Sequence, residues 1–208
     1  MARYRGAVCR LCRREGEKLF LKGERCHSAS CSVEKREGGP GQHGKARQAR
    51  SDYKIQLREK QKTKRLYCLT EGRFRKYYEV AAKSKGVTGT EMLIGLEGRL
   101  DVVVYRAGFA PSLANARQIV KHGHVKVNDK RVNIPSYMVS PSEKITISEK
   151  LKNNPLVTSS LTAALGRGGC GWISVDKDNL SATMDSVPTR DQLSQSINEQ
   201  LIVELYSR

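Results

Sequence analysis

The sequence has no long apolar segment. In 208 residues no run of consecutive apolar side chains exceeds four, as at Val102–Tyr105, whereas a membrane-spanning helix needs about 20. The first residues, MARYRG, carry charge but no apolar core, so they do not predict a secretory signal. We therefore expect a cytoplasmic protein in a reducing compartment, where structural disulfides are rare.

Acidic residues are also scarce. The chain has 38 Lys and Arg against 21 Asp and Glu, which gives a formal net charge of +17. Residues 1–50 contain 13 basic and 5 acidic residues, whereas residues 151–208 contain 5 and 6. A positive field of this kind attracts polyanions, and without a membrane segment nucleic acid is the favoured partner.

Cysteine is infrequent, but four of the six cysteines lie within 23 residues. They form the pairs Cys9/Cys12 and Cys26/Cys31, separated by 13 residues. Two short thiolate pairs can bind one Zn2+ tetrahedrally, and the metal would stabilise a segment too polar to bury a core. We therefore predict one structural zinc ion. The alternatives are four unrelated thiols, His27 replacing Cys26 as a ligand, or a redox pair, for which no βαβ pattern is found.

A loop and a basic helix follow the cysteines. Residues 37–44, EGGPGQHG, are typical of a linker, in which His43 either contacts RNA or is solvated. Ser51 is a predicted N-cap. The helix after it carries one stripe of basic residues at helical spacing. The stripe consists of Lys54, Arg58, Lys62 and Arg65. Only one acid, Glu59, lies among them, so ion pairing does not explain the stripe, and we predict that it binds phosphates.

Helical patterns continue to residue 97. Aromatic residues recur at helical spacing in residues 71–81, and residues 88–91, TGTE, form a capping box before an apolar helix face. We expect these aromatic residues to form a core rather than to stack on bases.

Residues 98–150 have mixed character. Residues 99–106 predict either a strand, from their β-branched side chains, or a helix capped by Asp101. A clearer helix runs from the N-cap Ser112 to Gly123. Apolar and polar residues then alternate in HVKVNDKRVNI on both sides of a turn, which predicts a hairpin, and KITIS predicts a further strand. This pattern predicts a basic helix packed on a small antiparallel sheet.

The last 58 residues are nearly neutral. Residues 161–165 predict a helix and 172–175 a strand. GRGGCG has the spacing of a dinucleotide loop, but the strand before it and the helix after it are missing. The end of the chain, NEQLIVELYSR, predicts a strand-like apolar segment docked on the rest.

The order of short motifs identifies a family. The stretches ARYRG, CRLCRREG, LKGERC, PGQHG, LREKQK, GFA, ARQIVKHGH, VN, IPSY and NEQL occur in this order. Almost end to end, the chain resembles the bacterial small-subunit ribosomal protein family conventionally numbered four. One departure is Asn128-Asp129, where members usually have Asn-Gly at the hairpin turn.

The resemblance implies an α+β fold with three parts. These are a zinc-binding basic arm and linker (1–44), a helical RNA-binding domain (45–97) on which residues 196–208 pack back, and an αβ RNA-binding module with a C-terminal extension (98–195). Patterns and resemblance together predict RNA contacts, besides the basic stripe, by Arg3, Arg13, Arg14, His43, Arg47, Arg50, Arg73, Arg106, Ser112, Arg117, Lys121, His122, His124, Lys126, Asn128, Lys130 and Arg131.

The resemblance further implies a non-catalytic constituent of the small subunit. Such a protein binds ribosomal RNA early in assembly, contacts neighbouring ribosomal proteins, lies near mRNA and affects decoding accuracy, as a monomer within the ribosome. The main alternative is an RNA-modifying enzyme that shares the αβ module, but no paired carboxylates or nucleophile–base arrangement occur after residue 150. A zinc-dependent transcription factor is a further alternative, but the cysteine cluster lacks a helix placed for the major groove.

Overall fold

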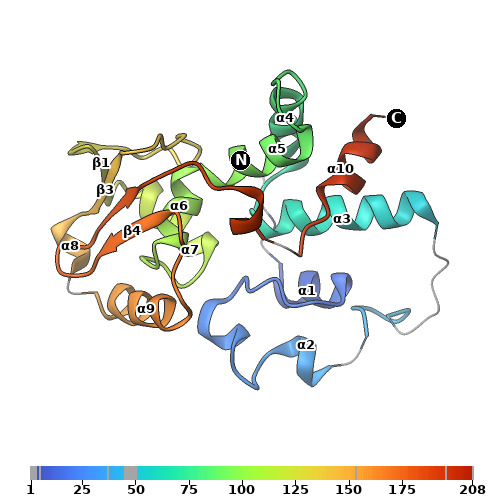
Figure 1. Cartoon of the computed structure of the whole chain (residues 1–208). Coiled ribbons are helices and arrows are strands. Elements are labelled where there is room, and N and C mark those ends of the chain that lie inside the picture. Colours follow the sequence, from blue (N-terminus) through green and yellow to red (C-terminus); the bar gives the residue numbers. More distant parts are fainter. Residues whose placement is uncertain are drawn as a thin grey trace. The chain divides into compact units, whose positions relative to one another are not determined.

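The computed structural model describes residues 4, 6–36, 38–44, 51–152, 154–194 and 196–207. The chain forms two compact units. The helical unit comprises Met1–Met92 and Gln195–Arg208, and the sheet unit comprises Leu93–Ser194. Figure 1 shows the elements of both units. Among the described residues, no helix combines the length and the apolar character needed to cross a bilayer.

The helical unit contains short helices in its N-terminal part and longer ones after residue 51. The division between the two units falls within α5. The elements are α1 (Cys9–Glu15), the 3-10 helix η1 (Gly23–Cys26), α2 (Ser32–Lys35), α3 (Asp52–Leu66), α4 (Glu71–Ala81), α5 (Thr88–Glu97) and α10 (Glu199–Tyr206).

Helix α3 begins at its predicted N-cap and ends in a left-handed residue. Ser51 is the N-cap, and its Oγ accepts a hydrogen bond from Lys54 N at 3.3 Å. After the last turn Cys68 adopts the left-handed conformation (φ 51°), and Leu69 N donates to Lys64 O at 3.0 Å. This bond satisfies a carbonyl that the helix end leaves open.

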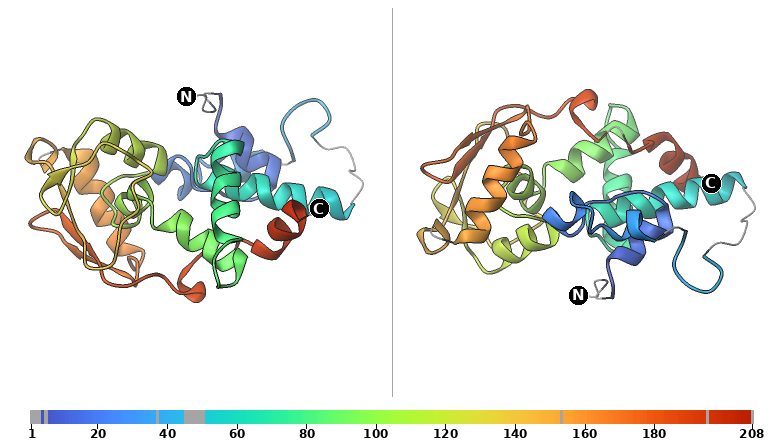
Figure 2. Two further views of the ribbon diagram at one scale, coloured as in Figure 1. Left: turned by 90° about the horizontal axis from the view of Figure 1, so that it is seen from above. Right: turned by 90° about the horizontal axis from the view of Figure 1, so that it is seen from below.

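The chain ends in a helix, α10, and not in the predicted strand. The short run Leu201-Ile202-Val203 fits either period, and packing on α3 decides the outcome. Ile202 is fully buried. The Tyr206 ring lies 4.9 Å from the ring of Tyr78 and 6.3 Å from that of Phe74. Both views in Figure 2 show α10 beside α3.

The sheet unit is built on a five-stranded antiparallel sheet in the order β2-β1-β3-β5-β4. The predicted alternation in the first strand is confirmed, because Val125 and Val127 are buried and Lys126 is exposed. The strands are β1 (Val125–Val127), β2 (Lys130–Arg131), β3 (Lys144–Ile147), β4 (Ile173–Asp176) and β5 (Ser181–Met184).

Helices of the sheet unit share one apolar core with the sheet (Figure 1). The ambiguous segment 99–106 contains a helix, because the consecutive residues 100–104 are all buried and a strand exposed on one face could not bury them all. The helical elements are α6 (Leu100–Arg106), α7 (Leu113–Lys121), α8 (Glu149–Lys152), α9 (Pro155–Gly166) and the 3-10 helix η2 (Arg190–Gln192).

The β1–β2 hairpin turns at Asn128 and Asp129. Both residues have positive φ, 46° and 65°, as a type I′ turn requires. Asn128 Oδ1 also accepts a hydrogen bond from Lys144 N at 3.0 Å. The turn is therefore of the tight hairpin type even though aspartate stands in place of glycine.

Candidate nucleic-acid interface and metal centre

Basic and imidazole side chains gather at the β1–β2 hairpin and the end of α7. We call this group the hairpin surface, and it consists of Lys121, His122, His124, Lys126, Asn128, Lys130 and Arg131. All are exposed except His124, which is half-buried.

Hairpin pairing and the chain before β1 fix the geometry of this surface. Lys126 and Arg131 are Cα partners in the ladder, so their side chains share one face of the hairpin. Arg131 Nη2 donates to His122 O at 3.3 Å. The rings of His122 and His124 lie 6.3 Å apart. A cationic group of this kind suits phosphate oxygens.

Arg117 does not belong to this surface, which corrects the prediction. It is 8% exposed, and its Nη1 lies 3.4 Å from Asp101 Oδ2. The Asp101 carboxylate also accepts from Arg99, through Nε at 2.9 Å and Nη2 at 2.7 Å. Because α6 packs against α7, Asp101 lies where Arg117 can pair with it inside the core.

Two more of the predicted RNA-binding residues also have structural contacts. Arg106 donates to Glu97 from Nε at 2.9 Å and from Nη2 at 2.5 Å, a bidentate pair with a carboxylate that is only 1% exposed. Ser112 is the N-cap of α7, as predicted, and accepts from Asn115 N at 3.4 Å. Contacts of either residue with RNA stay predictions.

The basic stripe on α3 has acidic partners from other segments. The prediction that ion pairing does not explain the stripe is therefore wrong. Glu15 of α1, whose side chain is 2% exposed, forms ion pairs with Arg65 Nη1 and with Arg58 Nη1, the latter at 3.7 Å. Burial raises the pKa of Glu15, opposed by the charges of Arg58, Arg65 and Arg14.

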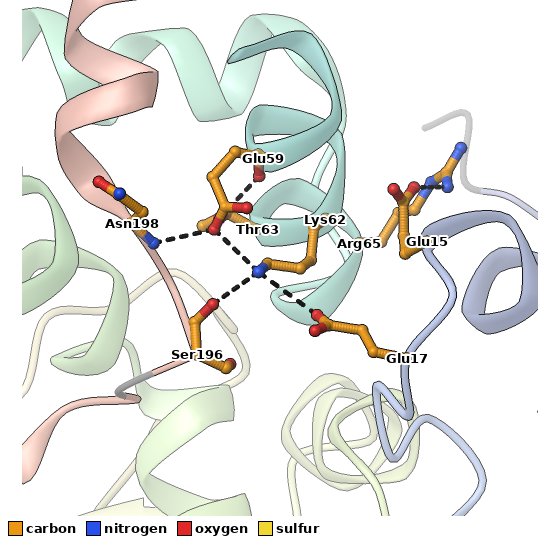
Figure 3. Close-up of polar contacts among 8 residues, drawn as sticks. All are labelled: Glu15, Glu17, Glu59, Lys62, Thr63, Arg65, Ser196 and Asn198. Carbon is orange, nitrogen blue, oxygen red and sulfur yellow. Dashed lines mark hydrogen bonds and ion pairs between the residues drawn. The ribbon is translucent and has the colours of Figure 1, made fainter. Parts of the chain in front are cut away.

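Lys62 joins three segments of the helical unit (Figure 3). Its Nζ lies 3.4 Å from Glu17 Oε1 and 2.9 Å from Glu59 Oε1, and it donates to Ser196 O at 2.5 Å. Glu59 Oε1 in turn accepts from Asn198 N at 2.8 Å. The side chain of Lys62 is 11% exposed. These contacts hold the segment after α1 and the start of α10 on α3.

A second group of contacts fixes α4 and α10 on α3. Glu71 Oε1 accepts from Lys60 Nζ at 2.7 Å and from Tyr206 Oη at 2.8 Å, and Glu71 Oε2 accepts from Lys64 Nζ at 2.9 Å. Burial alone would raise the pKa of Glu71, but the three hydrogen bonds outweigh it and lower the pKa to about 2. Burial and the contact with Glu71 raise the pKa of Tyr206 above its ordinary value.

The remaining predicted RNA contacts differ in exposure. Arg13 donates to the carbonyl oxygens of Gly38 at 3.2 Å and Gly39 at 3.0 Å, so it holds the glycine-rich loop. Lys54 is half-buried, whereas Arg14, His43 and Arg73 are exposed. Arg3, Arg47 and Arg50 lie outside the described residues.

The four clustered cysteines are free thiols, and three of them are buried: Cys12, Cys26 and Cys31. Lys22 N donates to Cys26 Sγ at 3.3 Å. Burial raises the pKa of Cys12; the N–H of Leu19 lowers it, and the charges of Cys26, Cys9 and Cys31 raise it further. Each of the other three cysteines therefore acts on the Cys12 thiol through its charge.

The donor chemistry of this cluster fits zinc, because a divalent cation removes thiolate repulsion and N–H groups are common partners of ligating sulfur. A preformed metal centre is nevertheless absent from the part of the chain that the structure describes. No group of three or more His, Cys, Asp or Glu side chains there is arranged to hold a metal ion.

Sequence reasoning missed the acidic partners: Glu15, Glu17 and Glu71. Each lies outside α3, so a search for neighbours along the helix could not find them. The available signal for Glu71 was its position in a predicted helix that must pack on a strongly basic one, whereas no helix was predicted near Glu15 and Glu17.

Comparison with known protein families gives matches to two consecutive segments of the chain. Residues 3–97 match the family described as Ribosomal protein S4/S9 N-terminal domain, and residues 98–145 match the S4 domain. The second match contains the whole hairpin surface.

Proteins named small ribosomal subunit protein uS4 are similar over their full length. The chain is 54% identical to that of Koribacter versatilis over 209 residues, 51% identical to that of Acetivibrio thermocellus over 208 and 51% identical to that of Thermus thermophilus over 209. In each case the alignment covers 100% of both chains. The chain therefore belongs to the uS4 family of small ribosomal subunit proteins.

Proposed function

We propose that this protein is a structural, non-catalytic constituent of the small ribosomal subunit and that it binds the ribosomal RNA of that subunit. The observation that carries the proposal is the full-length similarity to relatives named as small ribosomal subunit proteins. The exposed hairpin surface within the matched S4 domain supports RNA as the partner.

The proposal extends to the setting that the family resemblance implies. The protein acts in the bacterial cytoplasmic ribosome, binds RNA early in subunit assembly, contacts neighbouring ribosomal proteins and mRNA, and influences decoding accuracy. It does so as a monomer by holding RNA through phosphate contacts, whose specificity comes from RNA shape.

Binding measurements on the purified chain test the RNA proposal. Small-subunit ribosomal RNA should bind more tightly than duplex DNA of equal length, and affinity should fall steeply with salt. Equal affinity for both nucleic acids at every salt concentration would contradict the proposal. Chemical footprinting on the same RNA would then locate the protected junction.

A charge reversal tests the hairpin surface. Lys126→Glu should weaken RNA binding and flatten the log–log salt slope by about 0.7–0.9 for each phosphate that the variant no longer neutralises. Lys177→Glu is the matched control, because Lys177 is exposed and follows β4 at the opposite edge of the sheet. If both variants weakened binding equally, the effect would come from net charge and not from the hairpin surface.

We also propose that Cys9, Cys12, Cys26 and Cys31 hold one structural Zn2+. The proposal is supported by four thiol donors in the helical unit, by the buried position of three of them, and by the N–H group directed at Cys26 Sγ. Zinc bound there would stabilise the segment from α1 to α2, where Cys12, Leu19, Cys26 and Cys31 are the buried apolar side chains.

Metal analysis tests the zinc proposal. Untagged protein should contain about one zinc per chain, as a four-cysteine site requires, and a thiol reagent should release it. Cys12→Ser should lose the metal, whereas Cys170→Ser, outside the cluster, should keep it. Protein with no zinc and four reactive thiols would refute the proposal.

A further inference from the structure

We propose that Glu15 is a positioning residue for RNA binding: it holds the guanidinium groups of Arg58 and Arg65 in place for a backbone phosphate. This inference rests on the proposed function. It assigns a role in anion binding to an acidic side chain, which by its charge alone should oppose the binding of RNA.

The geometry places one buried carboxylate between two arginines. Arg58 and Arg65 lie seven residues apart on α3 and so share one face of the helix. Both meet Glu15 through Nη1, and Figure 3 shows the contact with Arg65. Each of these two ion pairs uses one guanidinium nitrogen, whereas an arginine has five N–H donors.

Exposure distinguishes the carboxylate from the two cations. The Glu15 side chain is 2% exposed, whereas those of Arg58 and Arg65 are 27% and 20% exposed. An incoming phosphate can therefore reach the arginines but cannot reach Glu15. Two cations around one anion leave a net positive charge, to which the exposed Arg14 of α1 adds.

Two opposite roles can be imagined for Glu15. As a competitor it would occupy the arginines and would have to leave before RNA binds. Removing a partner from a buried ion pair is strongly unfavourable, so exchange with a phosphate is not the favoured route. As a positioning residue it stays in place and lowers the entropy cost of ordering two long side chains.

The two roles predict opposite signs for Glu15→Gln. A competitor, or net charge alone, predicts tighter RNA binding, because one negative charge is removed. Positioning predicts weaker binding by about tenfold, from the ordering cost of two arginine side chains. Glu34→Gln is the charge-matched control, since Glu34 pairs with Lys18 at an exposed site in the same unit.

The experiment measures the affinity for small-subunit ribosomal RNA across a salt series. Glu15→Gln should weaken binding and flatten the slope by about 0.7–0.9, the value for one phosphate, while Glu34→Gln should not weaken binding. Glu15→Asp keeps the net charge but withdraws the carboxylate by one methylene, so it should also weaken binding. It serves as the decisive variant if Glu15→Gln loosens α1.

A double-variant cycle separates positioning from a general structural role. In the background of Arg58→Gln with Arg65→Gln, Glu15→Gln should have no further effect on affinity, because it acts through those side chains. An undiminished effect in that background, or unchanged or tighter binding by Glu15→Gln and Glu15→Asp, would overturn the inference. Failure of the unaltered chain to prefer ribosomal RNA would instead refute the proposed function.

Discussion

Arg99 Nη2 donates to Asp101 Oδ2 at 2.7 Å, and both side chains are buried in the sheet unit. With Arg117 on the same carboxylate, Asp101 is shared by two buried cations. This group joins α6 to α7, and its charge makes the unit sensitive to the loss of Asp101.

We expect Asp101→Asn to lower the free energy of unfolding of the sheet unit by about 3–5 kcal/mol, because two buried arginines lose their shared carboxylate. Chemical denaturation followed by circular dichroism measures the change. Asp178→Asn removes an exposed carboxylate from the same unit and should change stability by less than about 0.5 kcal/mol. Equal effects of the two substitutions would show that the interior group adds nothing.

Lys62→Met should loosen both ends of the chain at once. The substitution removes the interactions of Nζ with Glu17, Glu59 and Ser196, and hydrogen bonds to a charged group contribute about 1.5–3 kcal/mol. Amide hydrogen exchange should therefore accelerate in α1 and α10 and stay unchanged in β1–β5. Lys76→Met, at an exposed position on α4, should leave all these rates unaltered.

Glu71 should make the helical unit sensitive to acid. Its pKa is lowered to about 2 in the folded state, so its contribution to stability is fully present above its ordinary pKa of 4.5. That contribution is lost as the pH falls from about 5 to about 2. Unfolding measured across this range should show the loss in the unaltered protein but not in Glu71→Gln.

The matched control for Glu71 is Glu79→Gln. Glu79 pairs with Arg75 on the exposed face of α4, where ion pairs contribute little. This variant should keep the acid-dependent loss of stability. If Glu71→Gln and Glu79→Gln gave the same pH profile, the hydrogen bonds from Lys60, Lys64 and Tyr206 would not control acid stability.

Asp129→Gly should stabilise the sheet unit. Asp129 has a φ of 65° in the hairpin turn, a conformation in which glycine avoids the Cβ penalty, and we expect a gain of about 0.5–1 kcal/mol. Asp129→Ala should have the opposite effect at the same position. Thermal unfolding of both variants measures the difference, and a gain from alanine as large as from glycine would contradict the turn assignment.

Local patterns predicted the parts of the fold that local interactions determine. Ser51 and Ser112 cap their helices as expected, and Val125 and Val127 face the core. The prediction for residues 99–106 was ambiguous and that for residues 198–208 was wrong, because β-branched or short apolar runs fit both the strand and the helix period. Only packing on distant segments selects the helix.

The contacts of the candidate site were harder to predict than the secondary structure, because they too depend on distant segments. Glu15 lies 50 residues from Arg65, so the periodicity of α3 contains no sign of its partner. Arg117 has the spacing of a surface residue beside Lys121, but Asp101 of the preceding helix makes it an interior one. Charge patterns show which helix face is basic and leave open which tertiary partner shares that face.

The pairing of α10 with α3 has a consequence for the order in which the chain acquires its structure during synthesis. The segments of the sheet unit are contiguous in sequence, so all of them are present once Ser194 has been added. The helical unit is discontinuous, and the side of α3 on which α10 packs lacks that helix until residues 199–206 have been added. We therefore expect the nascent chain to complete its second unit before its first.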